Sequence, residues 1–457
     1  MSRPGHLGRF GLAVLALTTL VTPAHANVAD LFGLGAAASG RAGAVAATTT
    51  DWSASHYDPA GLAFGRGYHV ALGVQATASR LSINDVDRPV TEPLGVTAGA
   101  SLPAPLYGPL EGKVSIGLAL YLLPTRVLRV IARLPSQPFF PYYDNRTQRL
   151  VALPAVAVRV HPKVGIGLAF NFLAGVAGGV RTDSGSTRAL EPRVDEEVFA
   201  TVKLNGGVRF DPRPGWSTAL VFRQAFSVPF KADTQNKVAG DRIDLAIDAE
   251  GLVTPHTLVA GLGWTSGGGK GQVQAGLDLS WAMWSRLGSP FVKVTSRIPF
   301  VGPLEGKLPA VEYKDAFGVR AGVDVTALDG RDFGLVVRGG LGVETSPVPA
   351  QRGVTNLVDG TKVAMALGTG LRLGRVGKHA ITVDAHVGLH LVTHVSYDKR
   401  VFAPGETGAP TDGLRDELPD MASDPSTLGT QVSNPGYPTL EGGGGILAGS
   451  LTLGVEL

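Results

Sequence analysis

The chain has 457 residues, of which 62 are glycine, none is cysteine and 17% are charged, with a formal net charge of +3. The absence of cysteine excludes a small exported scaffold stapled by disulfides, and intermixed acidic and basic residues exclude a nucleic-acid footprint. Mean hydropathy is slightly positive, at +0.16. No run approaches the roughly 20 apolar residues of a spanning helix, so an inner-membrane helical protein is excluded.

Residues 1–26 are typical of a secretory signal peptide. Arg3 and Arg9 give a positive start, residues 10–21 form an apolar run of signal-peptide length, and residues 24–26 (Ala-His-Ala) offer a small-residue cleavage site. The exported chain is therefore expected to begin at Asn27.

From residue 67 onward, apolar residues alternate with small or polar ones, as in Tyr68, Val70, Leu72 and Val74. This period of two predicts strands long enough to cross a membrane at a tilt, about 9–11 residues each. Fourteen runs are found, at residues 67–80, 94–104, 114–124, 149–161, 163–180, 199–211, 216–229, 256–265, 271–284, 315–326, 331–345, 361–373, 379–395 and 447–457. The fold class is all-β, and residues 67–457 are expected to form an antiparallel transmembrane β-barrel.

The connections between these strands alternate in length. Short turns, such as 161–163 and 211–215, alternate along the chain with long connections, such as 230–255 and 396–446. Short periplasmic turns, longer outer loops and an even strand number are typical of outer-membrane barrels. A soluble sandwich has no reason to keep loop length in step with strand parity.

Residues 27–66 show no strand period and are rich in glycine, alanine and serine. One interpretation is a disordered periplasmic tail. The other is a small N-terminal hatch that plugs the barrel, because small residues allow close packing in a confined lumen and a barrel of this width would leak without a plug.

Three segments carry a resemblance. They are Tyr57-Asp58-Pro59-Ala60-Gly61-Leu62 after a Gly-rich stretch, Trp281-Ala282-Met283-Trp284-Ser285, and Arg338-Gly339-Gly340 followed by Ser346-Pro347-Val348-Pro349. In this order they resemble the FadL/TodX family of outer-membrane transporters of long-chain fatty acids and other hydrophobic compounds. Members of that family carry Asn-Pro-Ala where this chain has Asp58, Pro59 and Ala60.

The resemblance implies a mechanism as well as a fold. An apolar ligand is caught on outer loops, passes to a site in the upper lumen, and leaves sideways when the hatch moves, through the wall beside a kinked third strand. Here the third strand is residues 114–124, and Pro124 fits a disruption at its outer end. Asp58, Pro59, Ala60 and Gly61 are the matching hatch residues.

The connection 124–148 is unusually apolar. Candidate ligand-binding residues in it are Val127, Ile131, Phe139 and Phe140. An exposed apolar patch marks a binding surface, here a landing site for hydrophobic ligands. Contact with the membrane interface, or packing among the loops, is the open alternative.

Strand parity turns several charged side chains toward the lumen. Most are expected to pair with one another or with the hatch. One or two arginines are candidates for binding a ligand carboxylate bidentately: Arg338 first, then Arg320 and Arg159. His386, His390 and His394 share one strand face, but residues four apart on a strand are roughly 13 Å apart, too far for one metal ion.

The sequence thus favours a passive transporter of hydrophobic small molecules in the outer membrane of a Gram-negative cell, acting as a monomer. The rival is a structural or adhesive barrel with a closed lumen. No enzyme, cofactor, metal or nucleic-acid partner is expected. The expected partners are the ligand, outer-membrane lipid and the barrel-assembly machinery. The hexapeptide Gly-Pro-Leu-Glu-Gly-Lys occurs at 108–113 and 302–307, with no functional account.

Overall fold

The computed structural model describes residues 29–88, 94–124, 137–144, 150–184, 190–238, 241–289, 291, 293–298, 302–305, 311–330, 333–351, 355–376, 379–398 and 439–457. The signal-peptide prediction lies outside these residues. Within them, no helix has both the length and the hydropathy needed to cross a membrane.

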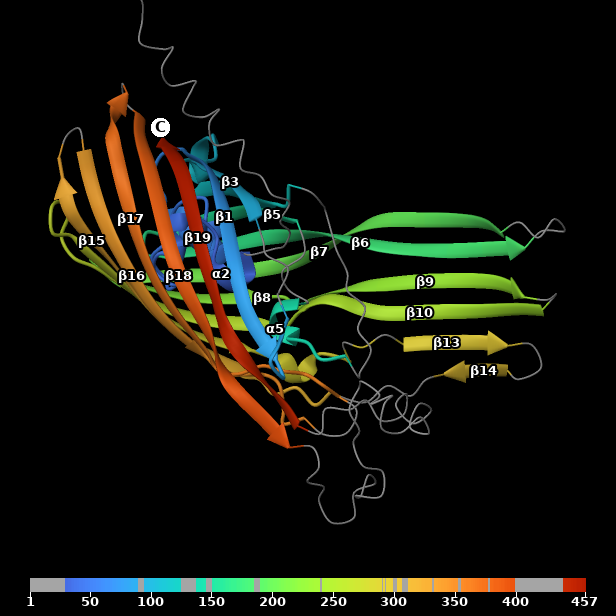
Figure 1. Ribbon diagram of the computed structural model, residues 1–457. Helices are drawn as coiled ribbons and strands as arrows, with labels where there is room; N and C mark the ends of the chain where they lie inside the picture. Colours follow the sequence, from blue (N-terminus) through green and yellow to red (C-terminus); the bar gives the residue numbers. More distant parts are fainter. Residues whose placement is uncertain are drawn as a thin grey trace, which may run out of the picture.

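Fourteen antiparallel strands form one closed ring (Figure 1). The first and last of them, β1 (His69–Ile83) and β19 (Thr439–Glu456), pair from His69↔Glu456 to Ile83↔Gly442 and close the ring. The others, in ring order, are β3 (Leu94–Pro103), β4 (Val114–Leu122), β5 (Val151–His161), β6 (Val164–Ser184), β7 (Leu190–Arg213), β8 (Trp216–Arg223), β11 (Thr257–Thr265), β12 (Val273–Ala282), β15 (Ala316–Asp329), β16 (Phe333–Glu344), β17 (Lys362–Val376) and β18 (His379–Asp398). The predicted fourteen-stranded barrel is confirmed.

The two ends of the barrel differ, as the sequence predicted. Tight turns such as the one between β7 and β8, whose flanking residues Arg213 and Trp216 are paired, mark what we call the short-turn end. The opposite, long-loop end carries β2 (Val86–Asp87), β9 (Phe226–Val238), β10 (Asp241–Thr254), β13 (Lys293–Ile298) and β14 (Gly302–Glu305).

These additional strands were not predicted, because their segments were interpreted only as long polar connections. β2 pairs with β1, and the other four form two hairpins, β9–β10 and β13–β14, that pair with each other through β10 and β13. β9 also pairs in parallel with the part of β6 beyond its pairing with β5. Pairing of this kind satisfies backbone groups that an unpaired edge strand would leave open.

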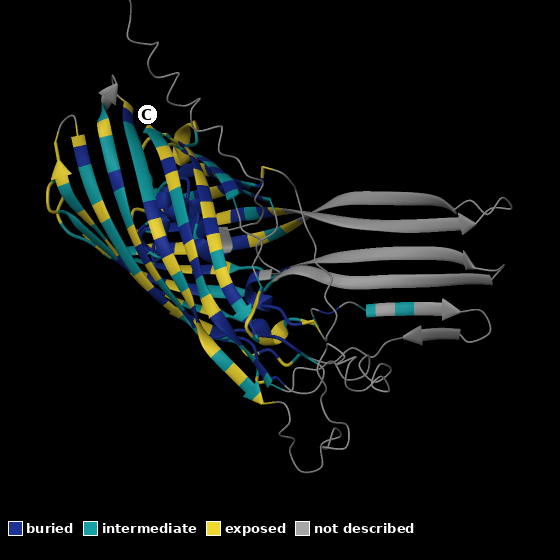
Figure 2. Cartoon of the chain, viewed as in Figure 1, coloured by how far each residue is buried: buried dark blue, intermediate teal, exposed yellow. Residues whose placement is uncertain are grey.

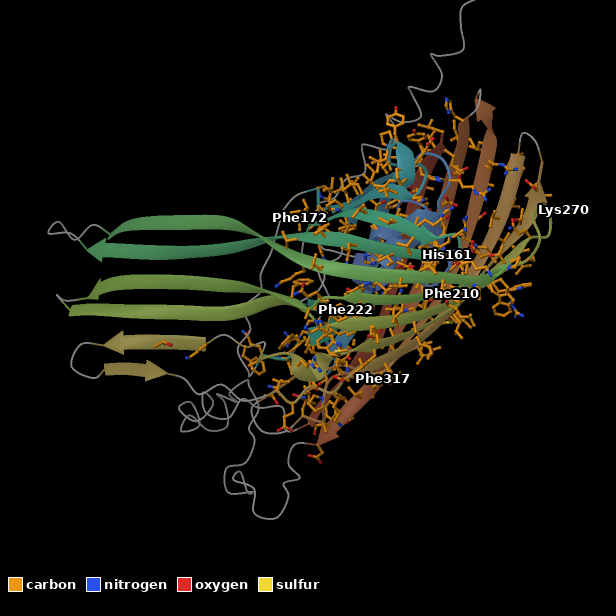
Figure 3. The ribbon with its side chains drawn as sticks, turned by 180° about the vertical axis from the view of Figure 1, so that it is seen from behind. His161, Phe172, Phe210, Phe222, Lys270 and Phe317 are labelled. Atoms are coloured by element: carbon orange, nitrogen blue, oxygen red, sulfur yellow. The ribbon has the colours of Figure 1, made fainter. Side chains whose placement is uncertain are left out.

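The outer wall of the barrel is apolar. Leu72, Leu341 and Leu367 are 59%, 61% and 66% exposed, and exposed residues alternate with buried ones along the strands (Figure 2). Phe172, Phe210, Phe222 and Phe317 also project from the wall (Figure 3). A band of exposed large apolar side chains opposite small or polar inward ones is the residue pattern of a membrane-spanning barrel.

The helices of the described chain are short, with four residues or fewer except for the six-residue 3-10 helix η2. Four lie before β1: α2 (Ala29–Phe32), α3 (Ala36–Ser39), α4 (Ala54–Tyr57) and the 3-10 helix η2 (Pro59–Phe64). The others are η3 (Gly108–Leu110) between β3 and β4, α5 (Pro141–Asp144) after β4, and η4 (Trp284–Arg286) after β12. The largest buried apolar cluster joins α2 to aromatic residues of the long-loop end, so the core of this protein lies inside the ring.

Candidate functional site

Residues 29–65, which we call the lumen segment, lie inside the ring of strands. α3 packs against β17, β18 and β19, whereas η2 packs against β5, β6 and β7. Because these two groups of strands occupy different parts of the ring, the segment crosses the interior from one group to the other (Figure 1). Leu34, Ala54 and Asp58 are fully buried there.

Glycines on the inner face of the wall let the lumen segment approach the strands at backbone distance. A Cβ atom added at Gly340 would lie closer than 3.0 Å to Arg41, and one added at Gly207 closer than 3.0 Å to Asp58. The same is true, against other parts of the segment, of Gly99, Gly117, Gly167, Gly263, Gly276 and Gly322. The wide spread of glycine along the chain therefore has a structural cause, since most strands need a position without a side chain.

Charged side chains of the wall hold the backbone of the lumen segment. Asp278 Oδ2 accepts hydrogen bonds from the N–H groups of Val45 and Ala46, both at 3.0 Å. Arg223 donates to the carbonyl oxygens of His56 and Tyr57 at 3.1 and 3.2 Å. These bonds satisfy backbone groups that burial in the barrel would otherwise leave unpaired.

Two further arginines do the same nearer the short-turn end. Arg209 donates to the carbonyl oxygen of Thr49 at 3.2 Å, and Arg159 donates through Nε to that of Ala63 at 2.7 Å. Both guanidinium groups also lie over the ring of Phe64, 5.1 Å from its centroid for Arg159 and 4.7 Å for Arg209. The structure thus places Arg159, a sequence candidate for ligand binding, against the lumen segment.

Asp58, Pro59, Ala60 and Gly61 form the start of η2. Asp58 Oδ1 accepts a hydrogen bond from the N–H of Ala60 at 3.0 Å and so caps the helix, with Pro59 in the first helical position. A Cβ at Gly61 would clash with the carbonyl oxygen of Thr49. Burial raises the pKa of the Asp58 carboxyl to about 7, because a buried carboxylate loses its hydration.

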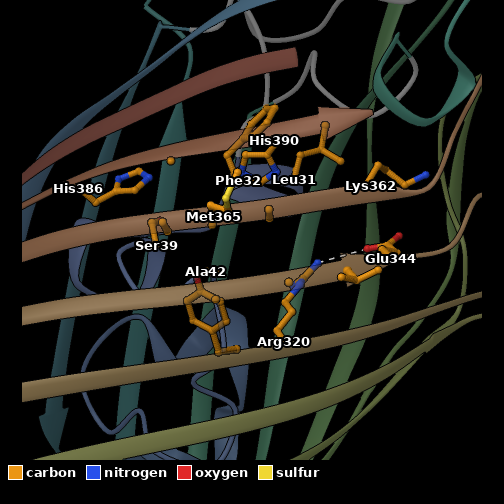
Figure 4. A pocket seen from close by; sticks show the side chains of 18 of the residues that line it. Leu31, Phe32, Ser39, Ala42, Arg320, Glu344, Lys362, Met365, His386 and His390 are labelled. Atoms are coloured by element: carbon orange, nitrogen blue, oxygen red, sulfur yellow. Dashed lines mark hydrogen bonds and ion pairs between the residues drawn. The ribbon is translucent and has the colours of Figure 1, made fainter. Parts of the chain in front are cut away.

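A first cavity, of about 60 Å³, lies between the lumen segment and the long-loop end (Figure 4). Its apolar and aromatic side chains include Leu31 and Phe32 of α2, Tyr57 of α4, Tyr142 of α5 and His390 of β18. Phe32 and His390 meet edge to face, with their ring centroids 4.7 Å apart. On this side the cavity therefore presents aromatic and apolar surfaces.

Polar groups stand on one side of this first cavity. Arg320 Nη2 lies 3.4 Å from Glu344 Oε2, and Tyr142 donates a hydrogen bond to Glu344 Oε1 at 2.7 Å. Lys362 pairs with Asp359 at 2.5 Å and lies 3.9 Å above the centre of the Tyr142 ring. The ion pair of Arg320 is longer than that of Lys362, 3.4 Å against 2.5 Å. Of these two cations, Arg320 is therefore the better placed to meet a bound anion.

Aromatic residues of the long-loop end cover the first cavity. Tyr142 stacks on Trp284 with ring centroids 5.9 Å apart, and Phe139 meets Phe291 at 6.5 Å. Phe139 and Phe140 are each only 1% exposed. The interpretation of these two residues as an exposed landing patch is therefore wrong, and the alternative, packing among the loops, describes them. Val127 and Ile131 lie outside the described residues.

A second cavity, of about 390 Å³, lies on the short-turn side of the lumen segment. It is lined by Ala37 and Trp52 from the segment and by Arg338, Arg372 and Asp384 from the wall. Arg338, the first sequence candidate, is here and not in the first cavity. It binds Asp384 at 2.6 Å and lies 3.7 Å from Asp324, which in turn lies 3.4 Å from Arg41 of the segment.

Tyr57 and Glu344 line the first cavity but were not among the candidates predicted from the sequence. Glu344 could have been found from the sequence, because residues at every second position of β16 share a face and Glu344 lies on the same inward face as Arg338. His386 and His390 share the inner face of β18, where His386 is buried, with 8% exposure, and its Nδ1 lies 2.6 Å from Ser450 Oγ. Among the described residues, no group of acidic and histidine side chains is arranged to hold a metal ion.

No family model matches the chain, and no curated protein matches it in sequence. Solved structures do. A Pseudomonas aeruginosa FadL homologue gives a TM-score of 0.56 at 10% identity, over 92% of this chain and 97% of that one. The P. putida toluene transporter TodX gives 0.55 at 13% identity, over 94% and 99%. The CymD monoaromatic hydrocarbon channel gives 0.54 at 11% identity, over 94% and 98%.

The chain has the fold of these transporters. The likeness that the sequence motifs suggested is thereby confirmed at the level of fold, over nearly the whole of each chain. By their own descriptions, these three proteins are a FadL homologue, a toluene transporter and a monoaromatic hydrocarbon channel.

The sequence resemblance implied a kink in the third strand, β4, and the structure differs from that expectation. β4 pairs with β3 from Val96↔Leu122 to Pro103↔Ser115 and with β5 from Val114↔Val158 to Tyr121↔Val151, with no shift of register in either ladder. Pro124 follows the end of β4. In this structure, therefore, the wall beside the third strand is intact along the paired length of β4.

Proposed function

We propose that the protein is an outer-membrane transporter through which small hydrophobic molecules pass without an energy source, and that the first cavity holds the cargo. The observation that carries this proposal is a cavity lined on one side by Leu31, Phe32 and Tyr142 inside a barrel with an apolar outer wall. An apolar molecule gains free energy by leaving water for such a site. The descriptions of the structural neighbours, a FadL homologue and two hydrocarbon carriers, support the same class of cargo.

In this proposal the long-loop end faces outward and collects cargo, and the lumen segment acts as a hatch. A cavity of about 60 Å³ has room for only a few water molecules. A fatty acid or similar long ligand therefore requires α2, α3 or the aromatic cover around Tyr142 to move. Long-chain fatty acids, the cargo that the sequence resemblance implies, also need a cation for the carboxylate, since burying an unpaired charge is costly.

Arg320 is the residue that we assign to this carboxylate. It lines the first cavity, its side chain is one-third exposed, and among the described residues its ion pair is with Glu344, at the long distance of 3.4 Å. Arg338 is a weaker candidate, because Asp384 and Asp324 already neutralise it in the second cavity.

Binding of oleate and of oleyl alcohol to the purified protein in mild detergent tests the assignment. Arg320→Gln removes the charge but keeps a polar side chain, so a lost charge-assisted hydrogen bond of about 1.5–3 kcal/mol should weaken oleate binding about ten- to a hundredfold. Binding of the uncharged alcohol should stay the same. Arg213→Gln, on an exposed arginine at the short-turn end, is the matched control.

Other outcomes are equally informative. If Arg338→Gln weakened oleate binding and Arg320→Gln left it unchanged, the carboxylate site would move to the second cavity. Equal losses for both ligands would indicate damage to the fold. If the unmodified protein bound neither ligand, the transport proposal would fail, and the closed structural or adhesive barrel would take its place.

A further inference from the structure

Beyond the ring, six strands form a sheet of their own, which we call the outer sheet. β6 and β7 continue past the last residues that pair with β5 and β8, which are Phe172 of β6 and Asn205 of β7. β9 then pairs with β6, β10 with β9, β13 with β10 and β14 with β13, so the order is β7–β6–β9–β10–β13–β14. Figure 1 shows this sheet extending from the long-loop end of the barrel.

The pairing register sorts the residues of the outer sheet onto two faces, because directly opposite residues share a face and the face alternates along each strand. Val180 on β6 is opposite Val194 on β7 and Thr234 on β9. Thr234 is opposite Leu245 on β10, which is opposite Ser296 on β13. These residues define one face, which we call the apolar face; the residues between them define the charged face.

The two faces have opposite compositions. On β10 the apolar face holds Ile243, Leu245 and Ile247, whereas the charged face holds Arg242, Asp244 and Asp248. The neighbouring strands place Val180, Val194, Val198, Phe230, Val294 and Ile298 on the apolar face. They place Arg193, Asp195, Glu197, Lys231, Asp233 and Arg297 on the charged face. Glu196 and Asp241 are departures, since both are charged positions of the apolar face.

The apolar face continues the outer wall of the barrel. Phe172 on β6 is opposite Val202 on β7, and both lie on the outer wall, 41% and 44% exposed. The β6–β7 ladder runs on to Ser184↔Leu190 without a shift of register, so Val180 and Val194 share the face of Phe172. By Phe172 β6 already has the roughly 9–11 residues that a tilted strand needs to cross a membrane. The strand then continues for roughly 40 Å, at about 3.3 Å per residue.

No described helix or strand forms a layer on the outer sheet. β9, β10, β13 and β14 make their main contacts with one another and with β6. Six strands about 4.8 Å apart, with about six residues of 3.3 Å along each, give a face of roughly 600 Å². Exposed apolar patches larger than a few hundred Å² mark interaction sites. The apolar face is therefore a surface that needs a partner.

A second copy of this chain is the partner that this surface fits. Small molecules bind in concave sites, whereas apolar sheet faces pack against each other about 10 Å apart. A two-fold axis brings the same face of both copies together, and two faces of this size bury roughly 1,200 Å², the lower end of the range for stable interfaces. Since the apolar face continues the outer wall, it points away from the lumen, toward a neighbour in the same membrane.

We propose that two copies of this protein pair outside the membrane through the apolar faces of their outer sheets, as the two halves of a β-sandwich. The charged faces remain in water. This dimer takes the place of the monomer expected from the sequence, and it does not depend on which cargo the barrel carries.

Cysteine cross-linking in the outer membrane tests the pairing, because the chain contains no cysteine of its own. Gram-negative cells that produce full-length single-cysteine variants are treated from outside with bismaleimidohexane. Each variant on the apolar face has a matched control one residue away on the charged face of the same strand. The pairs are Thr182→Cys with Arg181→Cys, Thr234→Cys with Asp233→Cys, and Ser296→Cys with Thr295→Cys.

At least one apolar-face variant should form a covalent dimer, at least tenfold more than its control at equal amounts of protein. Monomers alone at all three apolar positions would overturn the proposal and leave the face to lipid or to a segment of the same chain. A product with a different protein would overturn it in favour of that partner. Equal cross-linking from both faces would reflect random encounters and would overturn it as well.

A charge on the apolar face provides the second measurement. In the variant that cross-links, Leu245→Glu should lower the dimer fraction at least tenfold, whereas Ala246→Glu, the next residue on the charged face, should leave it unchanged. Heat-dependent migration in detergent gels shows that the barrel has assembled, and Leu245→Asn is the second variant if Leu245→Glu does not assemble. A dimer fraction that neither Leu245 variant changes would overturn the proposal, because the apolar face would not be the interface.

Discussion

Asp58→Asn tests whether a buried charge in the lumen segment limits stability. Asp58 is fully buried, and among the described residues its Oδ2 has no hydrogen-bond partner. Burial raises the pKa of the carboxyl from 3.8 to about 7, although Arg209 and Arg223 act in the opposite direction. Asparagine keeps the oxygen that caps Ala60 and is neutral at every pH.

The magnitude follows from the two pKa values. Below about pH 4 the carboxyl is protonated in both the folded and the unfolded state, so the contribution to stability is fully present. Between pH 4 and 7 the unfolded state releases the proton and the folded state keeps it, so stability falls as pH rises. Each pKa unit is worth about 1.4 kcal/mol, and the shift from 3.8 to about 7 corresponds to ~4 kcal/mol at most.

The assay is the free energy of unfolding in urea, measured in mild detergent at about pH 3, 5.5 and 8. Asp58→Asn should match the unmodified protein at the lowest pH and exceed it by a few kcal/mol at the highest. Asp85→Asn, on an exposed turn residue, is the control and should change nothing. A difference between Asp58→Asn and the unmodified protein that is the same at all three pH values would refute the reasoning.

Further expected outcomes concern the wall and the lumen segment. Gly340→Leu, which points a side chain into Arg41, should lower the free energy of unfolding by more than 1–3 kcal/mol, whereas Gly339→Leu, which meets only the tip of Leu367 at 4.0 Å, should be tolerated. Leu341→Arg places a charge on the apolar outer wall and should cost about 2–4 kcal/mol in lipid bilayers, with Leu341→Ala as the control; an equal cost in both would argue against membrane contact there. Deletion of residues 27–47 should raise single-channel conductance well above that of the intact chain, and unchanged conductance would mean that the segment does not close the lumen.

The barrel was predictable because its signal is local. A period of two with large apolar residues on one face is written into each strand, and turn residues mark the boundaries. The hairpins β9–β10 and β13–β14 were not predictable in this way, since they depend on pairing with β6, which continues beyond the barrel. The repeated hexapeptide makes the same point: Gly-Pro-Leu is a 3-10 turn at Gly108–Leu110 and part of strand β14 at Gly302–Glu305.

The site was only partly predictable. The alternation of residues along each strand correctly turned Arg320 and Arg338 inward, but it carries no information on the height at which the lumen segment crosses the barrel. That height decides that Arg320 lines the first cavity, toward the long-loop end, whereas Arg338 lies on the other side of the segment and is neutralised by Asp384. It depends on contacts between residues far apart in the chain, such as Val45 with Asp278, and no single-strand pattern records them.

The pairing of β1 with β19 constrains how the protein is made. The lumen segment directly precedes β1, and the ring closes only when β1 meets the last strand, residues 439–456. A segment in backbone contact with most of the wall cannot be threaded through a finished, hydrogen-bonded ring. It must be seated while the sheet is still open, so that the inner surface is shaped around it and the final strand seals it in. Pairings between the two ends of a chain form slowly, because the whole intervening chain must be ordered first, and a chain released before β19 would carry its lumen segment on an open sheet.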